Sequence, residues 1–175
     1  MNQDPQGVLI SGVGGQGIVF AGRVLARAWF AQGRHVALRY TYGAEVMGTA
    51  VHSEVLASSR PLLCPYLERA DAAVVLHRAA LPEVLPRLSP GALLVLDEGV
   101  GQGRVPSGVK VEVRPFVSLA ARGRAGDPGR ASPLVALGFL ATRGVVDLDL
   151  LLATVEGEPA SAENRALLQQ GFALG

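Results

Sequence analysis

A glycine-rich turn near the start of the chain limits its fold more than any other feature. Gly12-Val13-Gly14-Gly15-Gln16-Gly17 has the spacing G-x-G-x-x-G. It follows a short apolar run, Val8 to Ser11, and opens an alanine- and leucine-rich segment, Gln16 to Gln32, that is too long for a strand. A glycine turn between a strand and a helix is typical of the ligand-facing corner of an α/β sheet.

The rest of the chain alternates between strand-like and helix-like segments. Gly33 is predicted to end the first helix, because glycine takes the left-handed conformation readily. The segment 120–132 is rich in glycine and arginine without apolar periodicity, so we expect a loop there. Asp147 and Ser161 are predicted helix N-caps. Strands are expected at 35–40, 50–57, 72–76, 92–96 and 109–114, and helices at 79–88, 133–143, 148–155 and 162–171.

This order of elements predicts an α/β protein. We expect a single Rossmann-like domain over residues 1–175, with a mostly parallel sheet flanked by helices and with further helices at the C-terminus. The first strand, helix and second strand are expected to form one βαβ unit. A length of 175 residues suits one domain, and neither an internal repeat nor a linker is visible.

Composition excludes several classes of function. Sixteen basic and fifteen acidic residues leave a net charge of +1, so we expect no nucleic-acid partner. Cys64 is the only cysteine, which excludes an internal disulfide, an iron-sulfur cluster and a cysteine-based zinc site within this chain. No apolar run reaches the roughly 20 residues of a membrane span, and the first residues do not resemble a signal peptide. We therefore expect a cytoplasmic protein without membrane contact.

The glycine turn is suited to an anion. Its glycines permit a tight turn, close approach of a phosphate and close packing of helix on strand, and the helix N-terminus favours negative charge. NAD-binding units also carry an acidic residue about 20 residues further on, but Leu38 to Thr41 contains none. Arg39 could instead meet a 2′-phosphate of NADP. A free-standing NAD(P)-dependent oxidoreductase is therefore one alternative, and a scaffold with an empty turn is another.

The stretch GVGGQGIVFAGRVLA, with its G-G-Q-G core, resembles the start of the gamma subunit, or equivalent domain, of 2-oxoacid:ferredoxin oxidoreductases. These include the pyruvate, 2-oxoglutarate and indolepyruvate enzymes. Tyr42 to Thr49 is similar to the family's Y-G-x-E-x-R-G-G loop, with Met47 in place of arginine and Thr49 in place of glycine. Further matches at 85–91, 135–138 and 163–164 extend the resemblance over nearly the whole chain.

The resemblance implies a complex that oxidatively decarboxylates a 2-oxoacid to an acyl-CoA and passes electrons to ferredoxin. This chain would be an accessory gamma-type subunit without catalytic or metal-binding residues. Thiamine diphosphate, magnesium and iron-sulfur clusters are expected on catalytic partner subunits, and coenzyme A at the interface of the complex rather than firmly on this chain. The implied cofactor-binding residues are Gly12, Gly14, Gly15, Gln16, Gly17, Tyr42, Gly43, Glu45 and Gly48.

Other polar residues are expected to have structural or solvent-exposed roles. The loop arginines Arg122, Arg124 and Arg130 could clamp phosphates of coenzyme A, although a solvated loop is the simpler account. His52 and Cys64 have no partners nearby in the sequence, so structural roles are favoured for both. No Ser-His-Asp arrangement is visible in the sequence.

Overall fold

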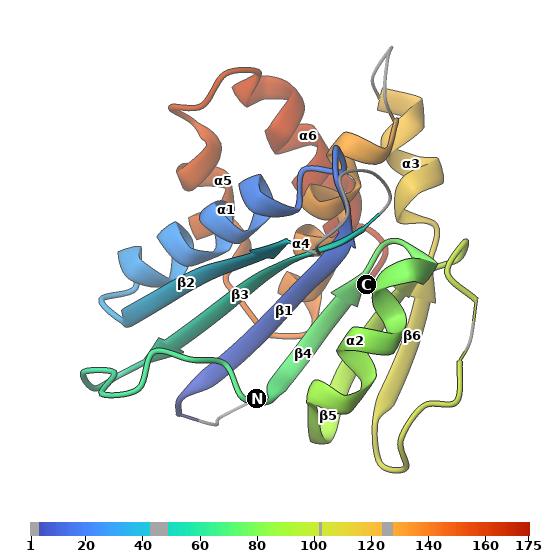
Figure 1. Ribbon diagram of the computed structural model, residues 1–175. Coiled ribbons are helices and arrows are strands. Elements are labelled where there is room, and N and C mark those ends of the chain that lie inside the picture. The colour runs from blue at the N-terminus through green and yellow to red at the C-terminus, as the bar shows by residue number, and fades with distance from the viewer. Residues whose placement is uncertain (1–3, 43–48, 102, 124–127) are drawn as a thin grey trace.

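A six-stranded sheet forms the centre of the protein (Figure 1). The structure is a computed structural model that describes residues 4–42, 49–101, 103–123 and 128–175. The strands lie in the order β2-β3-β1-β4-β5-β6, and β3 runs antiparallel to both its neighbours while the remaining pairs are parallel. The predicted mostly parallel α/β sheet is confirmed. The strand bounds are β1 Gln6–Val13, β2 His35–Tyr42, β3 Ala50–Ser58, β4 Ala70–Val75, β5 Leu88–Asp97 and β6 Lys110–Arg114.

Helices cover both faces of the sheet, but unequally (Figure 1). Five helices pack on one face around the buried Trp29, Phe116 and Phe139, whereas the short α2 and its flanking turns cover the other face. The helices are α1 Ile18–Ala31, α2 Leu81–Val84, α3 Phe116–Gly123, α4 Ser132–Thr142, α5 Leu148–Val155 and α6 Ser161–Phe172, and the 3-10 turns are η1 Arg78–Ala80, η2 Leu85–Arg87 and η3 Pro128–Ala131.

The topology creates a switch point between β1 and β4. From β1 the chain passes through α1 to β2 on one side, and from β4 it passes through α2 to β5 on the other side. Because α1 and α2 lie on opposite faces, the two connections diverge at the carboxyl ends of β1 and β4. In open α/β sheets this is where ligands bind. The glycine turn follows β1 at this point.

Several local predictions were wrong. β2 does not pair with β1, because β3 lies between them, so the expected βαβ unit is split by an antiparallel strand. The expected loop at 120–132 contains the end of α3 and all of η3. Ala160, not Ser161, is the N-cap of α6, and it has φ of 60° without a side-chain cap.

The other predicted N-cap, Asp147 of α5, is confirmed, since its side chain accepts a hydrogen bond from the Asp149 N–H at 2.8 Å.

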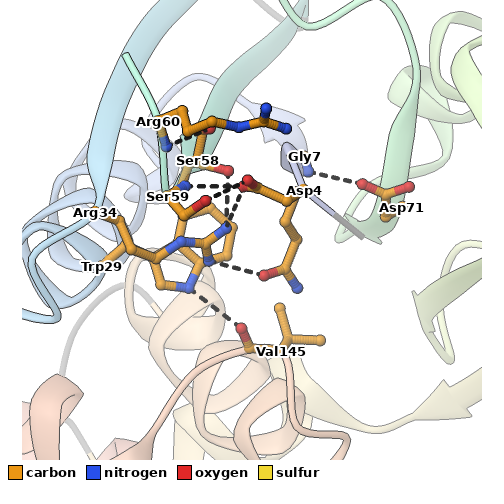
Figure 2. A network of polar contacts seen from close by, with 11 residues as sticks. Asp4, Gly7, Trp29, Arg34, Ser58, Ser59, Arg60, Asp71 and Val145 are labelled. Carbon is orange, nitrogen blue, oxygen red and sulfur yellow. Dashed lines mark hydrogen bonds and ion pairs between the residues drawn. The ribbon is translucent and has the colours of Figure 1, made fainter. Parts of the chain in front are cut away.

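A polar network fastens the opposite, amino-terminal end of the sheet (Figure 2). Asp4 accepts hydrogen bonds from the Ser59 N–H at 2.9 Å and the Ser59 hydroxyl at 2.5 Å, and these bonds lower the pKa of Asp4. Arg34 lies over the Trp29 ring and donates to the Ala57 carbonyl at 2.8 Å. Burial lowers the pKa of the Arg34 guanidinium. These contacts tie α1 to the ends of β1 and β3, so Arg34 has a structural role.

Candidate functional site

The glycine turn has the open backbone that an anion site requires. Gly15 has φ of 89°, and Gly17, the N-cap of α1, has φ of 78°, which are conformations that favour glycine. A Cβ added to Gly14 or Gly15 would meet nothing within 4 Å, so the space above the turn is open. Within the described parts of the chain, no oxygen accepts a hydrogen bond from the N–H groups of Gly14, Gly15 or Gly17. These donors point to an anion-binding role at the start of α1.

Gln16 holds the turn in this shape. Its side-chain oxygen accepts a hydrogen bond from the Val13 N–H at 2.9 Å, and its backbone N–H donates to the Val13 carbonyl at 3.2 Å. Its side-chain nitrogen donates to the Leu76 carbonyl, at the end of β4, over a longer 3.4 Å. A Cβ at Gly12 would lie 2.3 Å from the Gln16 side-chain oxygen, so the glycine at that position makes room for the amide. Gln16 therefore orders the turn from within rather than projecting toward a ligand.

The sheet register brings Tyr42 to the same edge as the glycine turn. Gly12 and Tyr42 both pair with Val51 of β3, one from each side. At about 4.8 Å per strand spacing, their backbones therefore lie roughly 10 Å apart. Tyr42 is 64% exposed, and the predicted site residues that follow it, Gly43, Glu45 and Gly48, lie outside the described residues.

The 3-10 turn η3 packs directly against the glycine turn. A Cβ at Gly17 would lie 2.4 Å from the Arg130 carbonyl oxygen, so only glycine fits this contact. Arg130 itself is exposed, which places a cation of the predicted arginine loop beside the start of α1. The side chains of Arg122 and Arg124 lie outside the described residues.

A Ser–His–Glu series, which the sequence did not reveal, begins at Ser11, just before the turn; Ser11 and His52 are buried, whereas Glu83 is exposed. The Ser11 hydroxyl is 2.8 Å from His52 Nδ1, and His52 Nε2 is 2.9 Å from a Glu83 carboxylate oxygen. Because a carboxylate only accepts, these partners assign the proton to Nε2 in the neutral ring and let Ser11 donate to Nδ1. Ser11 is completely buried, so it is not an accessible nucleophile. The series ties β1, β3 and α2 together, which agrees with the structural role expected for His52.

Two more polar residues shape the carboxyl edge of the sheet. Buried Asp97 accepts hydrogen bonds from the Gly99 and Val117 N–H groups, both at 2.9 Å, and so fixes the start of α3. His77 follows β4 and accepts a hydrogen bond from the Ala79 N–H at 3.2 Å. Both side chains are therefore engaged in local structure.

The open N–H groups of Gly14, Gly15 and Gly17 make the turn suited to binding an anion. Within the described residues, no group of three or more His, Cys, Asp or Glu side chains is arranged to hold a metal ion. No helix among them is long and apolar enough to cross a membrane. Fold and site together define an α/β protein with an open glycine turn at the switch point of the sheet.

The chain belongs to the pyruvate ferredoxin/flavodoxin oxidoreductase family, whose model matches residues 7–174. It is 28% identical over 169 residues to the 2-oxoglutarate synthase subunit KorC of Archaeoglobus fulgidus, covering 96% of this chain and 87% of that one. It is also 26% identical to the ketoisovalerate oxidoreductase subunit VorA of Methanothermobacter marburgensis, where the match covers 81% of this chain but only 29% of the larger relative.

Solved structures give the same result. The keto/oxoacid ferredoxin oxidoreductase gamma subunit of Geobacter sulfurreducens superposes with a TM-score of 0.82 at 25% identity, covering 98% of this chain and 96% of that one. The 2-oxoglutarate:ferredoxin oxidoreductase of Magnetococcus marinus, solved with 2-oxoglutarate, coenzyme A and succinyl-CoA bound, has a TM-score of 0.85 at 25% identity. That match covers 99% of this chain and 31% of that one. The predicted gamma-type subunit of a 2-oxoacid:ferredoxin oxidoreductase is confirmed.

Proposed function

We propose that this gamma-type chain contributes its glycine turn as a docking place for an anionic group of coenzyme A, inside a complex whose other subunits hold thiamine diphosphate and the iron-sulfur clusters. The observation that carries the proposal is the set of open N–H groups at Gly14, Gly15 and Gly17, at the switch point of the sheet. The Magnetococcus relative solved with coenzyme A supports this choice of ligand.

The residues present fit a phosphate of coenzyme A. Backbone N–H groups at the start of α1 supply hydrogen bonds and the positive end of the helix dipole. Exposed Arg130 lies beside the turn and adds a cation. When bound in the complex, coenzyme A supplies the thiol that accepts the acyl group. The part of this chain in that reaction is to bind and orient, with Gln16 holding the turn in its binding shape.

Gly14→Val in the reconstituted complex tests the proposal. Valine would fill the space above the turn, where an added Cβ meets no neighbour, so we expect an intact fold and a blocked phosphate site. The KM for coenzyme A should rise at least 10-fold while the KM for the 2-oxoacid stays unchanged. Gly157→Val is the matched control, because that glycine is also exposed with nothing within 4 Å of its Cβ position.

The assay should offer 2-oxoglutarate, 2-oxoisovalerate and pyruvate in turn, because relatives are named for the first two and the family for the third. An unchanged KM for coenzyme A in the Gly14→Val complex would contradict the proposal. Micromolar binding of NADP to the isolated chain, without a response to coenzyme A, would favour the free-standing oxidoreductase instead.

A further inference from the structure

Strand β2 leaves an unprotected edge on the sheet. Among the described residues it pairs only with β3, over eight consecutive residues without a register shift. Its sequence, HVALRYTY, is rich in strand-forming residues and contains neither proline nor lysine. Natural proteins usually shorten, bend or cover such an edge, because its unpaired N–H and C=O groups invite another strand. An edge of this length is therefore suited to pairing with another chain.

The elements that flank this edge carry one sign of charge. Residues 16–42, which include α1 and β2, contain four arginines and no acidic residue, although the whole chain has a net charge of only +1. Two of these arginines are already engaged, Arg27 by Glu158 and Arg34 by the network at the amino-terminal end. Arg23 and Arg39 are exposed and have no carboxylate partner among the described residues.

The two available arginines lie on opposite faces of the β2 edge. Arg23, on α1, is close enough to Tyr40 to act on its hydroxyl: burial raises the pKa of Tyr40, and the charge of Arg23 partly offsets this rise. Arg39 projects to the opposite face, where its guanidinium lies 5.4 Å from the centre of the Tyr66 ring. Glu54 is opposite Arg39 in the register, but its carboxylate accepts hydrogen bonds from Arg87 at 2.8 Å and Thr41 at 3.3 Å.

Exposed aromatic rings accompany these charges. Tyr42 at the end of β2 is 64% exposed, and Tyr66 beside Arg39 is 59% exposed. Tyrosine and arginine are enriched among the residues that dominate the binding energy of protein interfaces. The β2 edge thus combines unpaired backbone, exposed tyrosines and cations on both faces.

We propose that β2 is a docking edge for an extended acidic segment of a catalytic partner subunit, which adds to the sheet as a strand next to β2. Its alternate side chains would place carboxylates near Arg23 on one face and near Arg39 on the other. A second copy of this chain is disfavoured, because pairing two β2 edges would bring arginines together without acids to balance them. The inference rests on assembly with catalytic subunits, as in the proposed function.

Charge reversal tests the inference. The variant Arg23→Glu/Arg39→Glu should bind the catalytic subunits at least 10-fold more weakly in calorimetric titration, and the loss should shrink as salt is raised. The matched control is Arg104→Glu/Lys110→Glu, which makes the same change in net charge. Lys110 is exposed at the start of β6, the other edge of the sheet, and Arg104 is exposed in the connection that precedes β6. Equal weakening in both variants, or none in the first, would overturn the inference. Circular dichroism checks that both variants fold.

Hydrogen exchange supplies a second readout on the backbone itself. In the wild-type complex, amides of β2 that face away from β3 should gain protection, whereas those of β6 should not. Unchanged exchange in β2, or a homodimer of the isolated chain that protects β2, would overturn the docking edge. If the wild-type chain forms no complex at all, the proposed function fails first. If the wild-type complex forms, but charge reversal does not weaken it and β2 gains no protection, only the docking-edge inference is wrong and the proposed function stands.

Discussion

Gly138 is a position where one added methyl group should disturb the packing of two helices. It lies in α4, against α6, and a Cβ built there would be 1.9 Å from the Leu168 carbonyl oxygen. The contact is reciprocal, since a Cβ at Gly171 of α6 would be 1.8 Å from the Val135 carbonyl oxygen. Both neighbours are helix backbone, which cannot swing aside as a flexible side chain can.

The magnitude of Gly138→Ala follows from this geometry. Restoring an ordinary contact of 3.4 Å requires the two backbones to separate by about 1.5 Å, which forfeits much of the dispersion energy between well-packed helices. Overpacking of this severity costs about 3–4 kcal/mol, at or above the upper end of the usual range. Alanine recovers about 1 kcal/mol through its higher helix propensity. We therefore expect a net destabilisation of about 2–3 kcal/mol, or a Tm lower by roughly 4–12 °C.

Urea and thermal unfolding followed by circular dichroism measure this change. Gly157→Ala is the control, because an added Cβ there meets nothing within 4 Å, and its stability should stay within about 0.5 kcal/mol of wild type. The double variant Gly138→Ala/Gly171→Ala should cost less than the sum of its parts, because the first alanine already separates the helices. A Gly138→Ala protein as stable as wild type would refute the reasoning.

Two further predictions concern side-chain interactions. Glu112→Gln removes a carboxylate that accepts two hydrogen bonds of 2.7 Å from Arg143, contacts that hold the pKa of Glu112 below its ordinary value. Such a carboxylate stabilises the fold above the unfolded pKa, near 4.5, and this stabilisation is lost as the pH falls through the lower pKa of the folded state. Urea unfolding should therefore give the variant a free energy of unfolding about 1 kcal/mol below wild type at pH 7, with the difference narrowing below about pH 4. A difference that persists at pH 2 would argue against this account. Asp147→Ala removes the side-chain acceptor of the Asp149 N–H and should cost about 1 kcal/mol, whereas Asp147→Asn, which can still cap α5, should retain most of the stability.

The sequence predicted the elements that local chemistry controls. The apolar run from Val8, the glycines from Gly12 to Gly17 and the long helical segment that follows specified β1, the turn and α1. The cap at Asp147 was predictable for the same reason, because capping depends on residues adjacent in the chain. Ser161 failed as a cap, since Ala160 takes a left-handed conformation and moves the N-cap position back by one residue.

Pairing between distant segments came only from the tertiary structure. The placement of β3 between β1 and β2 depends on contacts between segments that are distant in the chain. The sequence around each strand carries no information about which strand will lie beside it. The same insertion aligns Gly12 with Tyr42 across Val51 and leaves β2 as an edge.

The glycine turn shows where local and tertiary determinants meet. Its spacing alone predicted an anion site, because the required N–H groups belong to consecutive residues. The inward engagement of Gln16 with Leu76 and the contact of Gly17 with Arg130 join residues more than 50 positions apart. Such contacts arise only when the packed sheet and helices bring those segments together. The amino-acid order therefore predicted an anion at the turn, and the folded arrangement decided which residues shape the turn and which face outward.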